Sequence, residues 1–365
     1  MKRKSFTLIE LIVVIVVLAI VSSITFDILA KLYRHYVFTR EMNKLNTKLD
    51  YTMEIIGNRL RDRIRNSVII TKYPKTLSDS DEDKVDFKPI GELDDGDEKY
   101  YKIIEWIGKD YEAKNGMWDY RTKHIQTAWS GFIDLGYNSH KTQDNPKEFN
   151  VTTPDSNFTM MRLIDENITK SYGINVKNTF EENYTTLIFS GIDQGGDIVE
   201  DLNESYGWYL NPDKERKAKA IFAILQYRDY VNVNATETEL NITSISENND
   251  TSLYSRYFIT RSAYALVPIE NNETLPNGKK INDYNLTFVY NYQPWRGDWW
   301  NGNDGTTGSG KGEVNRTLLA THVTEIRFKK DRNTHIIRLY LCIQSPNVEI
   351  NSTRNLTLCK EKAIF

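Results

Sequence analysis

One carboxylate, Glu10, stands inside an otherwise apolar run that extends from Phe6 to Phe26. As a helix, this run would be ~31 Å long, which is enough to cross a bilayer. An ionisable side chain in such a segment is costly and almost always has a partner. The chemistry expected of Glu10 is therefore pairing with a positive charge that the run itself does not contain.

The rest of the chain carries thirteen Asn-x-Ser/Thr sequons, each with a side-chain amide that could accept an N-glycan. In eleven of them an acidic residue stands two positions before the Asn, although 50 of 365 residues are acidic and chance would give about two. The form Asp/Glu-x-Asn-x-Ser/Thr resembles the acceptor of bacterial oligosaccharyltransferases, which hold the acid with a basic side chain. The alternative, an Asn- and acid-rich composition, would explain the sequons but not this pairing. The eleven are Asn150, Asn157, Asn167, Asn183, Asn203, Asn241, Asn249, Asn272, Asn285, Asn315 and Asn351, whereas Asn234 and Asn355 lack the acid.

Motifs of catalytic and nucleotide-binding sites are incomplete in this sequence. Residues 305–311 have the spacing G-x-x-x-x-G-K, but Gly312 replaces the Ser or Thr that holds Mg²⁺, and no apolar strand precedes them. The five histidines do not stand at metal-ligand spacing, and the chain has no G-x-S-x-G or H-E-x-x-H. The acidic stretch 94–98 offers hard oxygens for Ca²⁺, but it lacks the helix-loop-helix pattern, which favours a solvated loop. We therefore expect no enzyme, no cofactor and no metal site.

Two further features concern cysteine and tryptophan. An even pair of cysteines, Cys342 and Cys359, predicts a disulfide in an exported protein, provided that the last two strands pair. The Trp- and Gly-rich segment 293–314 contains Trp295, Trp299 and Trp300. These side chains either form an exposed recognition surface or tuck under the segment and fix it, and the sequence does not distinguish the two.

The elements that would position these residues are a long helix and a set of strands. Residues 27–70 continue the N-terminal helix, because apolar residues recur there at spacings of three and four and Pro is absent from residues 1–73. The stripe is Leu45, Leu49, Met53, Ile56, Leu60, Ile64 and Val68, and we expect it to pack on a sheet. β-Branched and aromatic residues predict strands at 185–190, 220–227, 257–269, 286–292, 322–329, 335–344 and 356–365. The fold class expected is α+β, with the long helix packed on an antiparallel sheet.

Composition agrees with a folded, polar-surfaced body. The chain has 365 residues, a net charge of −3 and 12% aromatic residues. That length accommodates one large or two ordinary domains after the helix. The small net charge implies no general attraction to nucleic acid.

The N-terminus, residues 2–10 with the sequence KRKSFTLIE, resembles the leader of the type IV prepilin family. In that family a membrane peptidase cuts before the Phe, the new amine is N-methylated, and the Glu neutralises the N-terminal amine of a neighbouring subunit. The resemblance implies a cut between Ser5 and Phe6 and a pairing of Glu10 with a neighbour's Phe6 nitrogen. The family prefers Gly before the cut, so Ser5 predicts slower processing, and Asp27 stands where many major pilins have a kink-forming Pro.

The resemblance implies a structural protein of the bacterial envelope. The expected parts are a leader at 1–5, a transmembrane and filament-core helix at 6–26, its amphipathic continuation at 27–70, and a periplasmic or surface β-rich domain at 71–365. The leading hypothesis is a minor pilin-like subunit of a type IV pilus, at or near the tip. A J-like minor pseudopilin of type II secretion is an alternative, and a non-polymerising membrane-anchored binding protein is one of another class.

The resemblance also implies partners and a location. The partners would be other pilins or pseudopilins, the prepilin peptidase and an inner-membrane assembly platform. The chain would span the inner membrane once, with its bulk in the periplasm, and would later enter a surface filament or a periplasmic pseudopilus.

Overall fold

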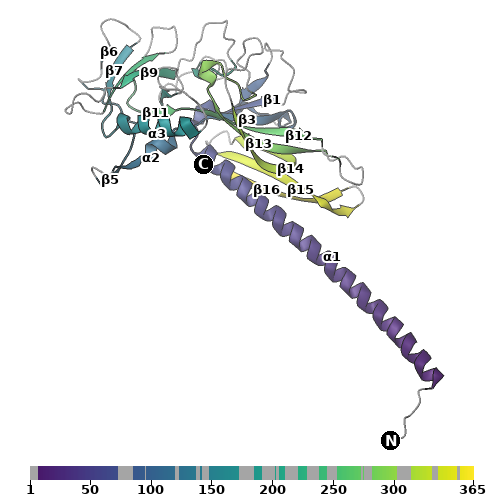
Figure 1. Cartoon of the computed structure of the whole chain (residues 1–365). Coiled ribbons are helices and arrows are strands. Elements are labelled where there is room, and N and C mark those ends of the chain that lie inside the picture. The colour runs from purple at the N-terminus through teal and green to yellow at the C-terminus, as the bar shows by residue number, and fades with distance from the viewer. Residues whose placement is uncertain are drawn as a thin grey trace.

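One long helix projects from a body built mainly of antiparallel strands (Figure 1). The computed structural model describes residues 7–72, 85–94, 96–119, 123–136, 140–141, 148–171, 185–190, 202, 205–209, 221–227, 238–244, 253–272, 274, 282–301, 314–330, 336–351 and 354–365. The long apolar helix followed by a curled antiparallel sheet confirms the predicted α+β class.

The long helix, α1, comprises Leu8–Arg61, 54 residues with a length of ~80 Å. The sequence predicts a helix to residue 70, and this prediction is wrong by about nine residues. After Arg61 the chain joins the sheet, because the Ile64 N–H donates to the Ile107 carbonyl at 2.8 Å. A run of β-branched residues, 68–71, follows and favours extended backbone over helix.

Within the described residues, eight antiparallel strands form a larger sheet in the order β16-β15-β14-β13-β12-β3-β1-β2. One face of this sheet packs on α1, and the other packs on residues 202 and 205–209 and on the loop that follows β13. The strands are β1 (Ile69–Lys72), β2 (Phe87–Pro89), β3 (Tyr101–Ile107), β12 (Ala263–Asn271), β13 (Asp283–Tyr292), β14 (Asn315–Lys330), β15 (Ile337–Asn351) and β16 (Arg354–Ile364).

The apolar stripe of α1 packs on this sheet as predicted. Its members Leu45, Leu49, Met53, Ile56 and Leu60 are buried in one cluster with side chains of β14, β15 and β16. The cluster uses the second half of the helix, and the first half extends beyond the body (Figure 1). The stripe therefore fixes the helix to the body at one end and leaves the other end free.

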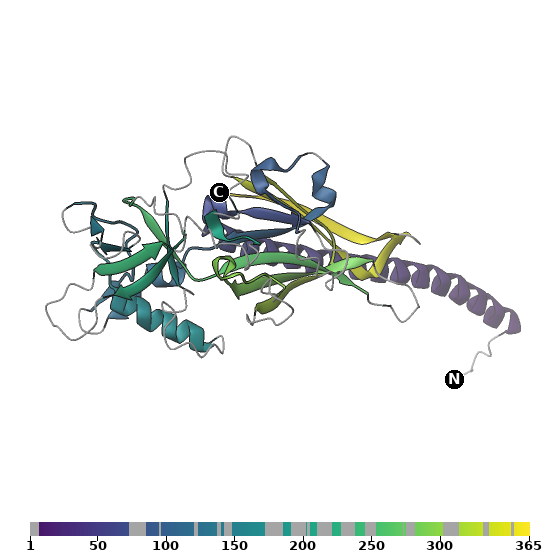
Figure 2. The same ribbon diagram turned by 90° about the horizontal axis from the view of Figure 1, so that it is seen from above.

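A smaller sheet lies at the end of the molecule farthest from the N-terminus (Figure 2). In the described part of the chain it has the order β11-β8-β9-β10-β7-β6. Its core contains Trp129, Phe149 and Phe158. The elements of this lobe are α2 (Tyr111–Asn115), β4 (Met117–Asp119), β5 (His124–Gln126), β6 (His140–Lys141), β7 (Glu148–Thr152), α3 (Phe158–Ser171), β8 (Thr186–Phe189), β9 (Ile221–Tyr227), β10 (Glu239–Ser244) and β11 (Tyr257–Thr260).

The run 257–269, predicted as one strand, is two strands in different sheets. β11 pairs with β8 in the smaller sheet, whereas β12 pairs with β3 and β13 in the larger one. Arg261 and Ser262 separate the two strands, and the Gly108 N–H donates to the Ser262 carbonyl at 3.2 Å. Residue type predicts an extended chain correctly here, but it does not reveal the change of sheet.

The predicted strand 322–329 does not alternate regularly between the two faces of the sheet. Strict alternation would place Val323 on the face opposite to Ile326 and Phe328, yet all three side chains are buried in the cluster around α1. The pairing of β14 with β15 shifts between Val323 and Glu325, as a β-bulge does. An inserted residue reverses the alternation, so residues on either side of it share a face.

Candidate assembly helix and the sites of the body

The helix α1 begins with a capping box made by Thr7 and Glu10. The Glu10 Oε2 atom accepts from the Thr7 backbone N–H at 3.0 Å and from the Thr7 hydroxyl at 2.9 Å, and the Glu10 N–H donates to Thr7 Oγ1 at 3.4 Å. These bonds satisfy donors that a helix start leaves free. Both Thr7 groups are neutral, so they hold the carboxylate in place without neutralising its charge.

The first half of α1 exposes an apolar surface. Twenty large hydrophobic or aromatic side chains between Leu8 and Phe38 are exposed, whereas the buried residues of the helix lie between Leu45 and Leu60. Among the described residues, α1 is the one helix long and apolar enough to cross a membrane. Burying one Leu or Ile side chain is worth ~1.5–3 kcal/mol, so covering this surface is worth tens of kcal/mol. The first half therefore needs lipid or other helices around it.

The helix passes Asp27 without a break. Asp27 Oδ2 lies 2.8 Å from Lys31 Nζ, one turn further along. Both side chains are exposed, so this pair contributes only a few tenths of a kcal/mol. Asp27 is a residue that a helix tolerates, and α1 continues through this position.

Polar contacts hold the second half of α1 on the sheet. Lys48 Nζ donates to the carbonyl and hydroxyl oxygens of Thr321 at 3.0 and 2.6 Å, and burial lowers the pKa of Lys48. Lys362 Nζ lies 2.7 Å from Glu54 Oε2 on the strand side of the helix. A Cβ on Gly57 would lie 3.2 Å from the same Nζ, so the glycine leaves room for the Lys362 side chain. These contacts add to the apolar packing that joins α1 to the sheet.

A buried acid, Glu105, lies on the other face of the larger sheet. Its side chain accepts hydrogen bonds from the hydroxyls of Thr71 at 2.7 Å, Tyr292 at 3.0 Å and Tyr209. Burial raises the pKa of Glu105 to about 7, and these three hydrogen bonds limit the rise. The same burial, together with the nearby Glu105 charge, raises the pKa values of Tyr209 and Tyr292 well above their ordinary value. Glu105, on β3, is therefore hydrogen-bonded to three other segments of the chain.

Residue type and spacing in the sequence do not single out Glu105. Its partners are 34, 104 and 187 positions away along the chain, so no local spacing reveals the cluster. The available signal was weak: Glu105 stands alone in the otherwise apolar run of β3, IIEWI. An acid that accepts hydrogen bonds from three hydroxyls is typical of a buried polar group whose hydrogen-bonding capacity is satisfied.

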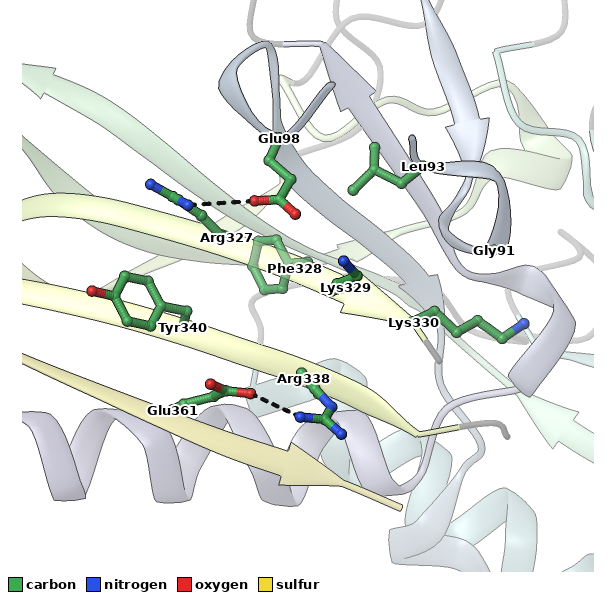
Figure 3. A pocket seen from close by; sticks show the side chains of 10 residues that line it. All are labelled: Gly91, Leu93, Glu98, Arg327, Phe328, Lys329, Lys330, Arg338, Tyr340 and Glu361. Atoms are coloured by element: carbon green, nitrogen blue, oxygen red, sulfur yellow. Dashed lines mark hydrogen bonds and ion pairs between the residues drawn. The ribbon is translucent and has the colours of Figure 1, made fainter. Parts of the chain in front are cut away.

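A groove of about 760 Å³ lies between residues 91–98 and strands β14, β15 and β16 (Figure 3). Arg327 Nη1 lies 3.6 Å from Glu98 Oε2, and Arg338 Nη1 lies 3.5 Å from Glu361 Oε1 across it. These pairs are largely exposed and contribute at most ~1 kcal/mol each. Its described lining combines charged side chains with those of Leu93, Phe328 and Tyr340.

The three Trp side chains of segment 293–314 are buried, which corrects the recognition-surface alternative. Trp295, Trp299 and Trp300 are 2%, 8% and 5% exposed. Trp295 and Trp300 belong to the cluster on the face of the larger sheet that is opposite to α1. Gly207 packs so closely on this loop that a Cβ there would lie 2.7 Å from Trp295 Cα. The side chains fix the loop, and residues 302–313 of the segment lie outside the described residues.

The predicted disulfide is present between Cys342 and Cys359. The two residues are register partners on β15 and β16, with their Cα atoms 4.0 Å apart. Sequence order alone placed them on neighbouring strands, and the antiparallel register brings them opposite each other.

The sequons are distributed over both sheets. Asn150, Asn167 and Asn272 are exposed, and Asn157, Asn241, Asn285, Asn315 and Asn355 are partly buried. Asn351 ends β15, and its side chain is not described. Asn183, Asn203, Asn234 and Asn249 lie outside the described residues.

The acidic stretch 94–98 engages cationic side chains of the protein. Asp97 Oδ2 lies 2.8 Å from Lys88 Nζ, and this hydrogen bond lowers the pKa of Asp97. Glu98 pairs with Arg327, as described above. Among the described residues, no three His, Cys, Asp or Glu side chains are grouped as a metal site. The glycine-rich run 305–311 lies outside the described part of the chain.

Comparison with known proteins adds one match. The prokaryotic N-terminal methylation motif matches residues 1–26 of this chain. No curated protein and no solved structure matches the chain. The match covers the basic leader, Glu10 and the apolar run, which continues as the exposed half of α1. The N-terminus of this chain is thus a type IV prepilin-like signal, which supports a pilin- or pseudopilin-like subunit.

Proposed function

We propose that this chain is a minor pilin-like structural subunit of a type IV pilus, with no enzymatic role. Prepilin peptidase cuts it between Ser5 and Phe6, and its N-terminal helix then enters a filament core made of similar helices. The observation that carries the proposal is the exposed apolar half of α1, with Glu10 in its first turn and the methylation motif across it. Such a surface is stable in a bilayer before assembly and in a bundle of apolar helices afterwards.

In this proposal Glu10 sets the axial register of the subunit. A carboxylate without a positive partner is strongly disfavoured in an apolar helix bundle. The cut creates a new positive charge in every subunit, the Phe6 amine, and in this proposal Glu10 pairs with the amine of a neighbouring subunit. The capping box supports this role, because Thr7 orients the carboxylate through neutral groups and leaves its charge to be matched by the neighbour.

The body supports a position at or near the filament tip. The larger sheet already covers the second half of α1, so the smaller sheet is not needed to attach the helix. The smaller sheet lies at the end farthest from the N-terminus (Figure 2). A subunit at the tip has room for such a lobe, whereas a subunit within the shaft would have to fit it between neighbours.

We further propose that the body faces the periplasm before assembly. The disulfide between Cys342 and Cys359 supports this orientation, because structural disulfides form and persist outside the reducing cytoplasm. The Asp/Glu-x-Asn-x-Ser/Thr sequons point the same way.

The test is to shear filaments from native cells and to probe them for wild type, Glu10→Ala and the control Asp27→Ala. Asp27 is also an exposed carboxylate on α1, but it already has Lys31 as a partner. We expect wild type and Asp27→Ala in the filament fraction, and Glu10→Ala retained in the membrane with an intact disulfide. Mass spectrometry should show that the mature chain begins at Phe6 and carries one methyl group.

Glu10→Ala at normal filament levels would contradict the register role. Wild-type protein that stays wholly in the envelope would contradict the pilus assignment. In that case an N-terminus at Phe6 would favour a type II secretion pseudopilin. Retention of residues 1–5 would favour a membrane-anchored binding protein that does not polymerise.

A further inference from the structure

The acid two positions before the Asn has two physical explanations. A glycosyltransferase could recognise the acid, the amide and the hydroxyl together. Alternatively, the pattern could follow from β-strands, in which residues i−2, i and i+2 lie on one face. The structure separates these explanations for the six acid-containing sequons whose three residues all lie in the described part of the chain. Their Asn residues are Asn150, Asn157, Asn167, Asn241, Asn272 and Asn285.

Three of the six sequons lie in interior strands, where their residues take part in strand pairing. Asn150 on β7 is the register partner of Asn241 on β10, and each neighbouring acid is opposite a Thr of the other strand. Asn285 lies on β13 between β12 and β14. The Oδ1 atoms of Asn241 and Asn285 are buried. Both edges of these strands are hydrogen-bonded, so the backbone of each sequon, including that of the exposed Asn150, is held in the sheet and cannot leave it to enter the site of an enzyme.

Two more of the six sequons lie at the start of helix α3 or within it. Asn157 stands just before it, where its Oδ1 accepts from the Met160 N–H at 2.9 Å and its Nδ2 donates to Gln126 Oε1 at 2.6 Å. Asn167 is exposed within α3, where residues two positions apart in the chain lie on different sides of the helix. Asn157 is thus held at the start of the helix, and Asn167 is held in helical backbone.

The sixth sequon, at Asn272, is presented for recognition. Glu270, Asn272 and Thr274 are all exposed. The pairing of β12 with β13 ends at Asn271 and Asp283, so Asn272 lies beyond the ladder. Asn271 Nδ2 donates to Asp283 Oδ1 at 2.9 Å, which fixes the strand end directly before the sequon.

We propose that Asn272 is an N-glycan acceptor, with Glu270 and Thr274 as the residues that a glycosyltransferase recognises beside it. The donor would be an oligosaccharide linked through its first sugar to a lipid diphosphate. The Asn272 Nδ2 atom forms a bond to C1 of that sugar, the bond from C1 to the diphosphate oxygen breaks, and the oxygen keeps the electron pair. The amide loses one proton to a base of the transferase. This inference rests on the proposed export of the body.

Digestion with trypsin separates the Asn272 sequon from the other sequons, so its occupancy can be measured by itself. Cleavage after Arg261 and Lys279 releases peptide 262–279, in which Asn272 is the one sequon. Cleavage after Lys280 and Arg296 releases peptide 281–296, which carries the Asn285 sequon alone. The second peptide is a matched internal control, because its sequon also has the acid but lies inside a strand.

The experiment is glycopeptide mass spectrometry of the full chain purified from native cells. We expect a glycan mass on peptide 262–279 and none on peptide 281–296. Asn272→Gln and Thr274→Ala should abolish the glycan, and Thr274→Ser should retain it. Glu270→Gln should lower occupancy about tenfold, because the carboxylate makes a charge-assisted contact, while Glu270→Asp should preserve it.

Peptide 262–279 found bare would overturn the proposal, and so would full occupancy in Glu270→Gln. Two further measurements distinguish this failure from failure of the proposed function. Protease access to the body in spheroplasts and formation of the Cys342–Cys359 disulfide report export directly. An exported, disulfide-bonded and bare protein refutes the glycan alone, whereas a protected, reduced and bare protein refutes the export as well.

Discussion

Arg261 Nη2 lies 2.7 Å from Asp110 Oδ1 at the junction of the two sheets. Arg261 separates β11 from β12, and Asp110 follows β3 and caps α2 through the Ala113 N–H at 3.1 Å. The Asp110 carbonyl also accepts from Trp129 Nε1 at 3.1 Å. The Asp110 side chain is fully buried and that of Arg261 is 15% exposed. This pair connects the elements of the smaller lobe to the larger sheet.

Arg261→Met should lower the free energy of unfolding by ~3–5 kcal/mol, because it leaves the buried Asp110 carboxylate without its cation. The control is Arg338→Met, which removes an exposed cation from Glu361 and should cost less than ~1 kcal/mol. Urea unfolding of the full chain in detergent, followed by Trp fluorescence, measures both. Equal effects of the two changes would show that the junction pair contributes no more than a surface pair.

Glu105 should make the stability of the body depend on pH. Its pKa is 4.5 in the unfolded chain and about 7 in the folded protein, so the folded protein keeps this proton to a higher pH. Stability from this group is complete below pH 4.5 and is lost as the pH rises to about 7, in total by about 3 kcal/mol. Unfolding midpoints measured from pH 4 to pH 8 should fall across this window.

Glu105→Gln tests the assignment, because an amide keeps the size of the side chain and does not titrate. The difference in unfolding free energy between the variant and wild type should rise in favour of the variant between pH 4.5 and pH 7 and stay constant above it. A difference that is independent of pH would exclude Glu105 as the source. Glu105→Ala should destabilise at every pH, because it leaves the hydroxyls of Thr71 and Tyr292 without their acceptor.

Removing the disulfide should destabilise the last hairpin without changing its register. The double variant Cys342→Ser/Cys359→Ser should lose ~3 kcal/mol of unfolding free energy, because the bridge closes a loop with a sequence separation of 17. Reduction of wild type by dithiothreitol should cause the same loss, whereas it should leave the double variant unchanged. An unaltered urea midpoint in both experiments would show that the bridge contributes no stability.

Two glycines, Gly207 and Gly96, have left-handed backbone, but only Gly207 is closely packed. Substituting each by Ala therefore distinguishes the cost of steric overlap from the cost of backbone strain. Gly207 has φ 81° and packs against the backbone of Trp295, whereas Gly96 has φ 111° and open space around it. Gly96→Ala should cost ~1–2 kcal/mol through its backbone alone. Gly207→Ala should cost several kcal/mol more in the same urea titration, since its Cβ meets main-chain atoms of the Trp loop. Similar costs would mean that this loop moves aside easily.

Local sequence patterns predicted the features that depend on the order of neighbouring residues. The apolar run with Glu10 in its first turn defined the helix and its signal, since length and hydropathy decide whether a segment can span a bilayer. The spacing of Leu45, Leu49 and Met53 predicted the face that packs on the sheet, because a helix repeats every 3.6 residues. The even pair of cysteines in the last two predicted strands predicted the disulfide between Cys342 and Cys359, and the register of β15 and β16 allows it to form.

The tertiary structure decided what depends on distant partners. It ended α1 at Arg61 because Ile64 pairs with Ile107, and it divided 257–269 between two sheets that have the same residue preferences. It buried Trp295 and gave Glu105 three hydroxyl partners from far along the chain. Periodicity specifies which face of an element is apolar, but burial, strand partners and pKa depend on which other segment covers that face.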